Sequence, residues 1–170
     1  MKQFLIILRG IPASGKSTIA KKLRNFGKKI VWLKVDSFKD FFGEGTEEQL
    51  IAANQTALSS LIYLLSKGYT VVMDGVFQDL SFVDQAVKIA KDVNIPRKVF
   101  QLEISLQTAK DRDKNREGIK EGYRKSIEEE LLNKIFERVS SKDYPEAIKI
   151  NTENNSLEAC LNIIHNHLND

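Results

Sequence analysis

The stretch FLIILRGIPASGKSTIAKKLRNF, which runs from Phe4 to Phe26, decides the fold of this chain. Its first five residues are apolar and have the length and composition of a buried strand. The segment Gly10–Ser17 then matches GxxxxGK[ST] without a mismatch. After it, apolar residues recur at helical spacing as far as Phe26, and Gly27 ends the predicted helix. Strand, glycine-rich loop and helix therefore follow one another as in a phosphate-binding loop, or P-loop.

Each residue type in this loop has a physical role. Gly10 and Gly15 allow backbone angles closed to other residues, so that successive N–H groups form an anion-binding nest at a helix N-terminus. We expect Lys16 to reach the β- and γ-phosphates and the Ser17 hydroxyl to coordinate Mg²⁺. The motif thus predicts binding of a nucleoside triphosphate. The expected loop contacts are Gly10, Ile11, Pro12, Ala13, Ser14, Gly15, Lys16, Ser17 and Thr18.

Length and composition limit the remaining possibilities. The 170 residues predict a single domain over residues 1–170, and the net charge of +3 is too balanced to indicate nucleic-acid binding by itself. One cysteine, Cys160, excludes an internal disulfide framework and favours a cytoplasmic protein. The N-terminal apolar run is too short for a signal peptide or a membrane span. We expect no structural metal, because His165 and His167 have no further ligands at suitable spacing.

Strand-like and helix-like segments alternate along the rest of the chain. A parallel sheet with helices on both faces is therefore expected, in an α/β fold of three layers. The further predicted strands are 30–35, 69–73, 98–104 and 147–150. The further predicted helices are 47–66, 81–92, 106–115, one from Ser126 with apolar positions as far as Val139, and 156–168, with capping boxes at Thr46/Gln49, Ser81/Asp84 and Ser126/Glu129.

In such sheets ligands bind beyond the carboxyl ends of the strands, and two of these ends carry aspartates. Asp36 follows the second predicted strand and is our candidate for the base that accepts the proton of an acceptor hydroxyl. The alternative is an aspartate that only caps a turn. Asp74 ends the third strand in a Walker-B-like pattern and is expected to hold Mg²⁺ directly or through water.

A basic stretch follows the fourth strand. Arg112, Arg116, Lys120 and Arg124 are spaced four residues apart, whereas Gly118 and Gly122 interrupt the helical pattern. This combination predicts a short hinged lid over about 112–125 that brings arginines onto ATP phosphates. The alternative is a solvated charged helix, since acidic residues alternate with the basic ones.

Aromatic residues follow both acidic strand ends. Phe38, Phe41, Phe42 and Phe77 are candidates for stacking on a ring of the acceptor, and core packing is the alternative. The segments Phe38–Gly45 and Gly75–Leu80 are expected to shape the acceptor pocket. The expected acceptor contacts are Asp36, Phe38, Lys39, Gly75 and Phe77.

Taken together, the segments GIPASGKST, VVMDG, AKDRDKNREG and INTENNSLEACLNII resemble the small P-loop kinases. The resemblance is to the broad group of polynucleotide 5′-kinases, zeta-toxin-like kinases, chloramphenicol phosphotransferase and adenylylsulfate kinase. It implies five parallel strands in the order 2-3-1-4-5, ATP as donor with Mg²⁺, and lid arginines at Arg112 and Arg116. It also implies that Asn151 and Thr152 lie near the adenine. Lys39 departs from the arginine usual in the polynucleotide and adenylylsulfate enzymes, which weakens both of these assignments.

The sequence therefore predicts an ATP-dependent kinase that transfers the γ-phosphoryl group to a hydroxyl acceptor. A polynucleotide 5′-hydroxyl ranks first as acceptor, followed by a metabolite, nucleoside or antibiotic, and then by adenylylsulfate. A GTPase-like switch is a rival interpretation, because Asp40–Gly43 matches DxxG, although no NKxD motif occurs. A second rival is a nucleotide-binding module that regulates a partner without chemistry.

Overall fold

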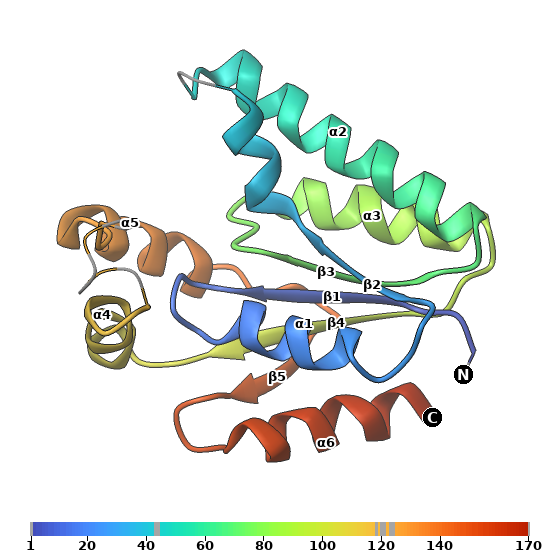
Figure 1. The fold of residues 1–170 in the computed structure, drawn as a ribbon. Coiled ribbons are helices and arrows are strands. Elements are labelled where there is room, and N and C mark those ends of the chain that lie inside the picture. Colours follow the sequence, from blue (N-terminus) through green and yellow to red (C-terminus); the bar gives the residue numbers. More distant parts are fainter. Residues whose placement is uncertain (1, 43–44, 118, 120–121, 123–124, 170) are drawn as a thin grey trace.

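The computed structural model describes residues 2–42, 45–117, 119, 122 and 125–169. Its centre is a sheet of five parallel strands in the order β2-β3-β1-β4-β5, as the resemblance implied (Figure 1). The strands are β1 (Leu5–Gly10), β2 (Ile30–Lys34), β3 (Thr70–Gly75), β4 (Arg97–Glu103) and β5 (Ile148–Asn151). The P-loop strand β1 is central, between β3 and β4, so the loop that follows it lies in the middle of one sheet edge.

Helices cover both faces of this sheet (Figure 1). They are α1 (Lys16–Arg24), α2 (Glu47–Ser66), α3 (Leu80–Asp92), α4 (Leu106–Lys114), α5 (Glu129–Ser140) and α6 (Leu157–Asn169), with a 3₁₀ segment η1 (Val35–Phe41). One core cluster joins the sheet to α2 and α3, and a second joins its other face to α1 and α6. A third, smaller cluster joins the P-loop residue Ile11 to α4 and α5. The predicted three-layer α/β fold is confirmed.

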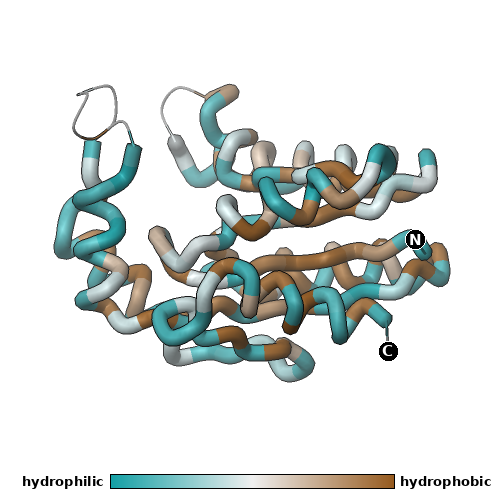
Figure 2. Tube along the Cα trace, turned by 60° about the horizontal axis from the view of Figure 1, so that its bottom comes forward, coloured by the Kyte–Doolittle hydropathy of each residue, from teal (hydrophilic) through white to brown (hydrophobic). Residues whose placement is uncertain are grey.

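Hydrophobicity of the central strands explains this layering. All six residues of β1 and all six of β3 are buried, as expected for strands covered on both faces. In Figure 2 the long central strand is hydrophobic along most of its length, whereas the surrounding helices alternate between hydrophobic and hydrophilic residues. Helices α3 and α6 point the predicted apolar positions inward, including Phe82, Val83, Leu161 and Ile164. The sheet is thus held between two hydrophobic layers.

Two of the three predicted capping boxes are wrong. The box at Thr46 and Gln49 is present at the start of α2, whereas α3 begins one residue earlier than predicted because Asp79 accepts the backbone N–H of Ser81 at 2.9 Å. Helix α5 begins only at Glu129, without a side-chain cap. Its approach is held out of helical geometry because the backbone N–H of Ile127 donates to the Asp113 carboxylate at 2.7 Å.

Helix α4 ends at Lys114, close to the predicted end of the helical stretch. Of the basic residues predicted to form a stripe beyond it, Lys120 and Arg124 lie outside the described residues. No described helix has the length and hydrophobicity needed to cross a membrane.

Candidate active site

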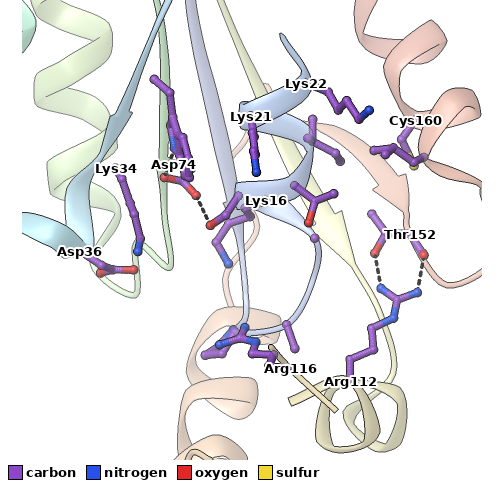
Figure 3. Close-up of a pocket in the computed structure, with 18 of the residues that line it drawn as sticks. Lys16, Lys21, Lys22, Lys34, Asp36, Asp74, Arg112, Arg116, Thr152 and Cys160 are labelled. Atoms are coloured by element: carbon purple, nitrogen blue, oxygen red, sulfur yellow. Dashed lines mark hydrogen bonds between the residues drawn. The ribbon is translucent and has the colours of Figure 1, made fainter. Parts of the chain in front are cut away.

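A cavity of about 1440 Å³ opens beyond the carboxyl ends of the strands. Its walls come from the P-loop and α1, from the ends of β2 and β3, from α4 and from the loop between β5 and α6. Figure 3 shows Asp36 and Lys34 on one side of it, Lys16 near the centre, and Arg112 with Thr152 on the other side. Residues from all the predicted strand ends thus meet in one space.

The P-loop has the backbone that the motif predicts, with one correction. Gly15 has φ +91°, and Ala13 is also in the left-handed region with φ 65°. Gly10 does not have a positive φ; its requirement is steric, because an added Cβ would lie 2.7 Å from the Leu102 carbonyl oxygen of β4. Gly15 is therefore needed for its conformation and Gly10 for close strand packing.

Lys16 lies inside the loop and is only 7% exposed. Its ammonium donates to the carbonyls of Gly10 at 2.8 Å and Ile11 at 2.7 Å. Burial lowers the pKa of Lys16 to about 8, although the carboxylates of Asp74 and Asp36 oppose this shift. An anion placed against the loop would favour the charged form of this lysine.

The buried carboxylate of Asp74 is held by two donors. The Ser17 hydroxyl donates to its Oδ2 at 2.8 Å, and the indole N–H of Trp32 donates to its Oδ1 at 2.8 Å. Burial raises the pKa of Asp74, whereas these two hydrogen bonds lower it. A hydroxyl and a carboxylate side by side, with phosphate and water completing the shell, are the ligand type that Mg²⁺ prefers. Ser17 and Asp74 therefore fit the predicted magnesium site.

Asp36 lines the same cavity from the 3₁₀ segment η1, which the sequence did not predict. Its carboxylate forms an ion pair with Lys39 at 3.0 Å, and both side chains are partly exposed. Because Lys39 lies three residues further along the same segment, it faces Asp36 and does not itself line the cavity. Asp36 is thus a solvent-accessible carboxylate opposite the P-loop.

Arg112 does not point at the P-loop but holds the β5–α6 loop against it. Its guanidinium donates to the Thr152 carbonyl at 2.8 Å and to the Thr152 hydroxyl at 3.4 Å (Figure 3). That hydroxyl donates to the Ser14 carbonyl at 3.0 Å. Thr152 is buried and lines the cavity, whereas the Asn151 side chain accepts backbone N–H groups of Glu153 and Asn154 and lies outside it.

Arg116 lies just beyond the end of α4 and also lines the cavity. Its guanidinium forms an ion pair with Asp113 at 3.2 Å, and the Asp113 carboxylate is almost fully buried. The same carboxylate accepts the backbone N–H of Ile127, so Asp113 joins Arg116 to the approach to α5. The two arginines predicted to act together therefore have different surroundings.

The remaining acceptor contacts expected from the sequence do not line the cavity. Phe77 is 9% exposed and stacks on Phe82 with ring centroids 5.4 Å apart, so core packing, the alternative interpretation, accounts for it. Gly75 makes room for the Phe77 ring, since an added Cβ would lie 2.7 Å from it. Phe38 is partly buried against the same core. Neither phenylalanine presents a ring face to the cavity.

Among the cavity-wall residues that sequence reasoning missed are Trp32, Lys34 and Lys21. Trp32 is the chain's single tryptophan and Lys34 lies two residues further along β2, while Lys21 lies one turn after Ser17 on α1. Alternation along the strand places Trp32 and Lys34 on one face, and helical spacing places Lys21 beside Ser17. This periodicity was the available signal.

Comparisons with solved structures identify the fold. A sugar kinase from Janibacter sp. has a TM-score of 0.73 with 15% identity, covering 99% of this chain and 95% of that one. A putative kinase from Chloroflexus aurantiacus has a TM-score of 0.72 with 17% identity, covering 98% and 99%. A chain of the Pnkp1/Rnl/Hen1 RNA repair complex has a TM-score of 0.69 with 21% identity, covering 82% of this chain but 45% of that one.

These identities are low, so the likeness is one of fold, and the fold is that of P-loop kinases. No curated protein matches the sequence. A family profile described as an AAA domain, AAA_33, matches residues 5–141, which include the P-loop, both acidic strand ends and α4. Since this match spans most of the sequence, the chain belongs to the AAA_33 family of P-loop domains.

Proposed function

We propose that this chain is a kinase that transfers the γ-phosphoryl group of ATP to a hydroxyl group of an acceptor. One observation carries the proposal: the accessible carboxylate of Asp36 and the P-loop lysine Lys16 line the same cavity from different walls. A P-loop alone binds nucleotide, whereas a carboxylate across from it can accept a proton from a second substrate. The arrangement therefore provides for two substrates.

The proposed transfer proceeds in line. ATP lies with its β- and γ-phosphates on the P-loop, where Lys16 and the backbone N–H groups neutralise their charge. The acceptor hydroxyl donates its proton to Asp36 as its oxygen forms a bond to the γ-phosphorus. The bond between that phosphorus and the β,γ-bridging oxygen breaks, and ADP leaves with the electron pair. Arg116 stabilises the charge on the transferring group.

Two further sets of residues complete the nucleotide site. Ser17 and Asp74 would hold Mg²⁺, which neutralises charge on the phosphate oxygens when it is bound. The loop that Arg112 holds through Thr152 is proposed to lie beside the adenine, with the Asn151 side chain shaping that loop from outside the cavity. The Thr152 hydroxyl also donates to the Ser14 carbonyl of the P-loop. This hydrogen bond connects the loop proposed to contact the adenine with the loop proposed to bind the phosphates.

The proposed reaction is a single one, whereas two classes of acceptor fit it. A polynucleotide 5′-hydroxyl is the first candidate, and the RNA repair complex among the similar structures supports testing it. A small hydroxyl compound is the alternative, supported in the same way by the sugar kinase. Both classes present a hydroxyl to the same base, so Asp36 has one role in either case.

The experiment that tests this proposal is transfer of label from γ-labelled ATP, with Mg²⁺, to short 5′-hydroxyl RNA and DNA oligonucleotides and to a panel of sugars and nucleosides. In Asp36→Asn we expect kcat to fall by roughly 10²- to 10⁴-fold while ATP affinity changes little, because only the proton acceptor is lost. The matched control is Asp92→Asn, which removes an exposed carboxylate paired with Lys88 on α3.

Three outcomes distinguish the alternatives. Label in an acceptor with the wild type and the control, but not with Asp36→Asn, supports the kinase and its base. Equal transfer by Asp36→Asn would show that Asp36 is a structural residue of the 3₁₀ segment. Tight ATP binding with no labelled acceptor in the whole panel would favour the nucleotide-binding module over the kinase.

A further inference from the structure

The cavity extends along α1 toward the edge strand β2. Lys21 from α1 and Lys34 from β2 line this part together with Trp32, on the side of the P-loop where Asp36 lies. In Figure 3 the side chains of Lys21 and Lys34 both extend into the cavity, and Lys34 lies directly beside Asp36. We refer to Lys21, Trp32 and Lys34 as the β2-side wall.

The fold fixes the direction of these side chains. Trp32 and Lys34 are two residues apart on β2, so they share the face on which Trp32 contacts Asp74. Lys34 and Asp74 are also direct neighbours in the β2–β3 register. Lys21 follows Ser17 by one helical turn and faces the same space. Two ammonium groups are therefore directed into the cavity next to the proposed base.

Two of the carboxylates of this region already have other partners. Both oxygens of Asp74 accept hydrogen bonds from Ser17 and Trp32, and Asp36 pairs with Lys39. Asp40 is a further carboxylate on the cavity wall and is exposed. Among the residues that the structure describes, no hydrogen bond or ion pair forms with Lys21 or Lys34. The β2-side wall thus presents two ammonium groups that no described carboxylate holds in an ion pair.

Positive charge continues beyond the cavity along the same helix. The Arg24 guanidinium lies over the Trp32 ring, 6.0 Å from its centroid. Lys21 and Arg24 are three residues apart on α1, so their side chains are neighbours. A ligand that extends from Asp36 along α1 would meet successive cations and one aromatic ring.

The ATP phosphates have their own partners in the loop and in Lys16. We propose that Lys21 and Lys34 bind a phosphate ester carried by the acceptor, next to the hydroxyl that Asp36 deprotonates. The proposal rests on the kinase function above and narrows its acceptor to an anionic hydroxyl compound. Two lysines suit a phosphate held as a point charge, without the bidentate geometry that arginine gives. A 5′-hydroxyl nucleotide with a 3′-phosphate and a phosphorylated sugar share this chemistry.

Equilibrium binding tests the site without requiring transfer. The probe is a short single-stranded DNA with a free 5′-hydroxyl and a 3′-fluorophore, titrated with the full chain in the presence of Mg²⁺ and ADP. Thymidine, thymidine 3′-phosphate and glucose 6-phosphate serve as competitors. We expect the double variant Lys21→Gln/Lys34→Gln to lose at least about tenfold in affinity for the phosphorylated ligand that binds, since hydrogen bonds to charged groups are lost.

Lys91→Gln is the matched control, because it removes one exposed lysine from α3 on the other face of the sheet. This variant should bind the probe as the wild type does, and the wild type should lose affinity as salt is raised. Competition by thymidine 3′-phosphate but not by thymidine supports the site and assigns a nucleotide acceptor. Competition by glucose 6-phosphate alone supports it with a small phosphorylated acceptor.

Other outcomes overturn the site. The site would be wrong if the double variant and Lys91→Gln bound with equal affinity, if thymidine displaced the probe as strongly as its 3′-phosphate does, or if no phosphorylated ligand bound. Failure of the kinase proposal is seen separately. If binding depends on Lys21 and Lys34 but no label is transferred, the phosphate site stands and the kinase proposal is wrong. If the double variant still transfers label to unphosphorylated acceptors, the kinase proposal stands and the phosphate site is wrong.

Discussion

At the scale of single residues, burial decides which charges can respond to a ligand. Lys16 is enclosed by the loop, and its ammonium donates to backbone carbonyls and the Ser14 hydroxyl, not to carboxylates. Its desolvated ammonium therefore has a pKa of about 8, lower than that of a lysine in water. Asp74 is the buried counterpart, with a pKa that burial raises. We therefore expect an anion bound at the P-loop to change the pKa values of Lys16 and Asp74 more than those of exposed groups.

This environment predicts a pH dependence of ATP binding. Phosphate favours charged Lys16 and raises its pKa, so the ATP complex binds more protons than the free chain above about pH 8. We expect the Kd for ATP to be flat between pH 7 and 8 and to rise by up to about tenfold per unit above that range. Isothermal titration calorimetry in buffers of different ionisation enthalpy would also report the proton uptake.

Lys16→Arg is the control for this profile, because a guanidinium stays charged over the whole range. The Kd of this variant for ATP is compared only between pH values, so a general loss of affinity does not affect the result. A Kd for the wild type that stays constant from pH 7 to 10 would contradict the assignment of the shifted group to Lys16.

At the scale of elements, α4 and the residues just after it place Arg112 and Arg116 in different surroundings. Arg112 in its last turn holds the Thr152 loop, whereas Arg116 beyond its end is held by buried Asp113. Spacing alone placed both residues on one stripe, because the pattern has no information about which loop or carboxylate each side chain meets. The same limit explains the α5 cap, since the Asp113 contact with Ile127 joins residues from separate elements.

The two arginines should therefore give different kinetic effects. Arg112→Ala should raise the Kd for ATP by about tenfold, because the β5–α6 loop loses a charge-assisted contact, with a smaller change in kcat. Arg116→Ala should lower kcat by roughly 10²-fold or more with ATP affinity nearly retained, since it removes charge stabilisation from the transferring group.

Steady-state kinetics with ATP titrations measure both parameters, provided that an acceptor has been found. Arg138→Ala, on the exposed side of α5, is a control for loss of an arginine. If both lid variants lowered only ATP affinity, Arg116 would be a binding residue and the proposed difference between the two would be wrong.

At the scale of the whole molecule, one buried arginine joins segments that are far apart in the sequence. Arg9 is fully buried and donates to the Phe77 carbonyl at 3.1 Å, to the Gln101 side chain, and to the Val139 carbonyl at 3.1 Å. These partners lie 68, 92 and 130 residues away. Gln101 in turn donates to Asp143. The strand before the P-loop is thereby tied to the segment after β3, to β4 and to the end of α5.

Sequence reasoning predicted the layers and the P-loop because these depend on local patterns and one specific motif, whereas the strand order came from the resemblance to P-loop kinases. It gave Arg9 no role, since an arginine at the end of an apolar run resembles a solvent-exposed boundary. Trp32 was missed for a similar reason. Its role is to donate a hydrogen bond to Asp74, and this contact exists only because β2 pairs with β3. Residues whose partners are set by tertiary structure were the ones that sequence could not assign.

The Arg9 network predicts a large effect of one substitution on global stability. Arg9→Met keeps an apolar stem of similar length but leaves three buried acceptors without their donor, so we expect the free energy of unfolding to fall by about 3–5 kcal/mol. Urea unfolding followed by Trp32 fluorescence and by circular dichroism would measure it. Arg24→Met, at the exposed end of α1, is the control and should change stability by less than about 1 kcal/mol.

The same unfolding curves test whether the chain behaves as one domain. Because Arg9 joins β1 to the segment after β3, to β4 and to α5, the wild type should unfold in a single transition seen alike by both probes. Two separate transitions would show that the Trp32 region unfolds apart from the rest. An Arg9→Met variant within 1 kcal/mol of the wild type would mean that water replaces the guanidinium, and that the network positions α5 without stabilising the fold.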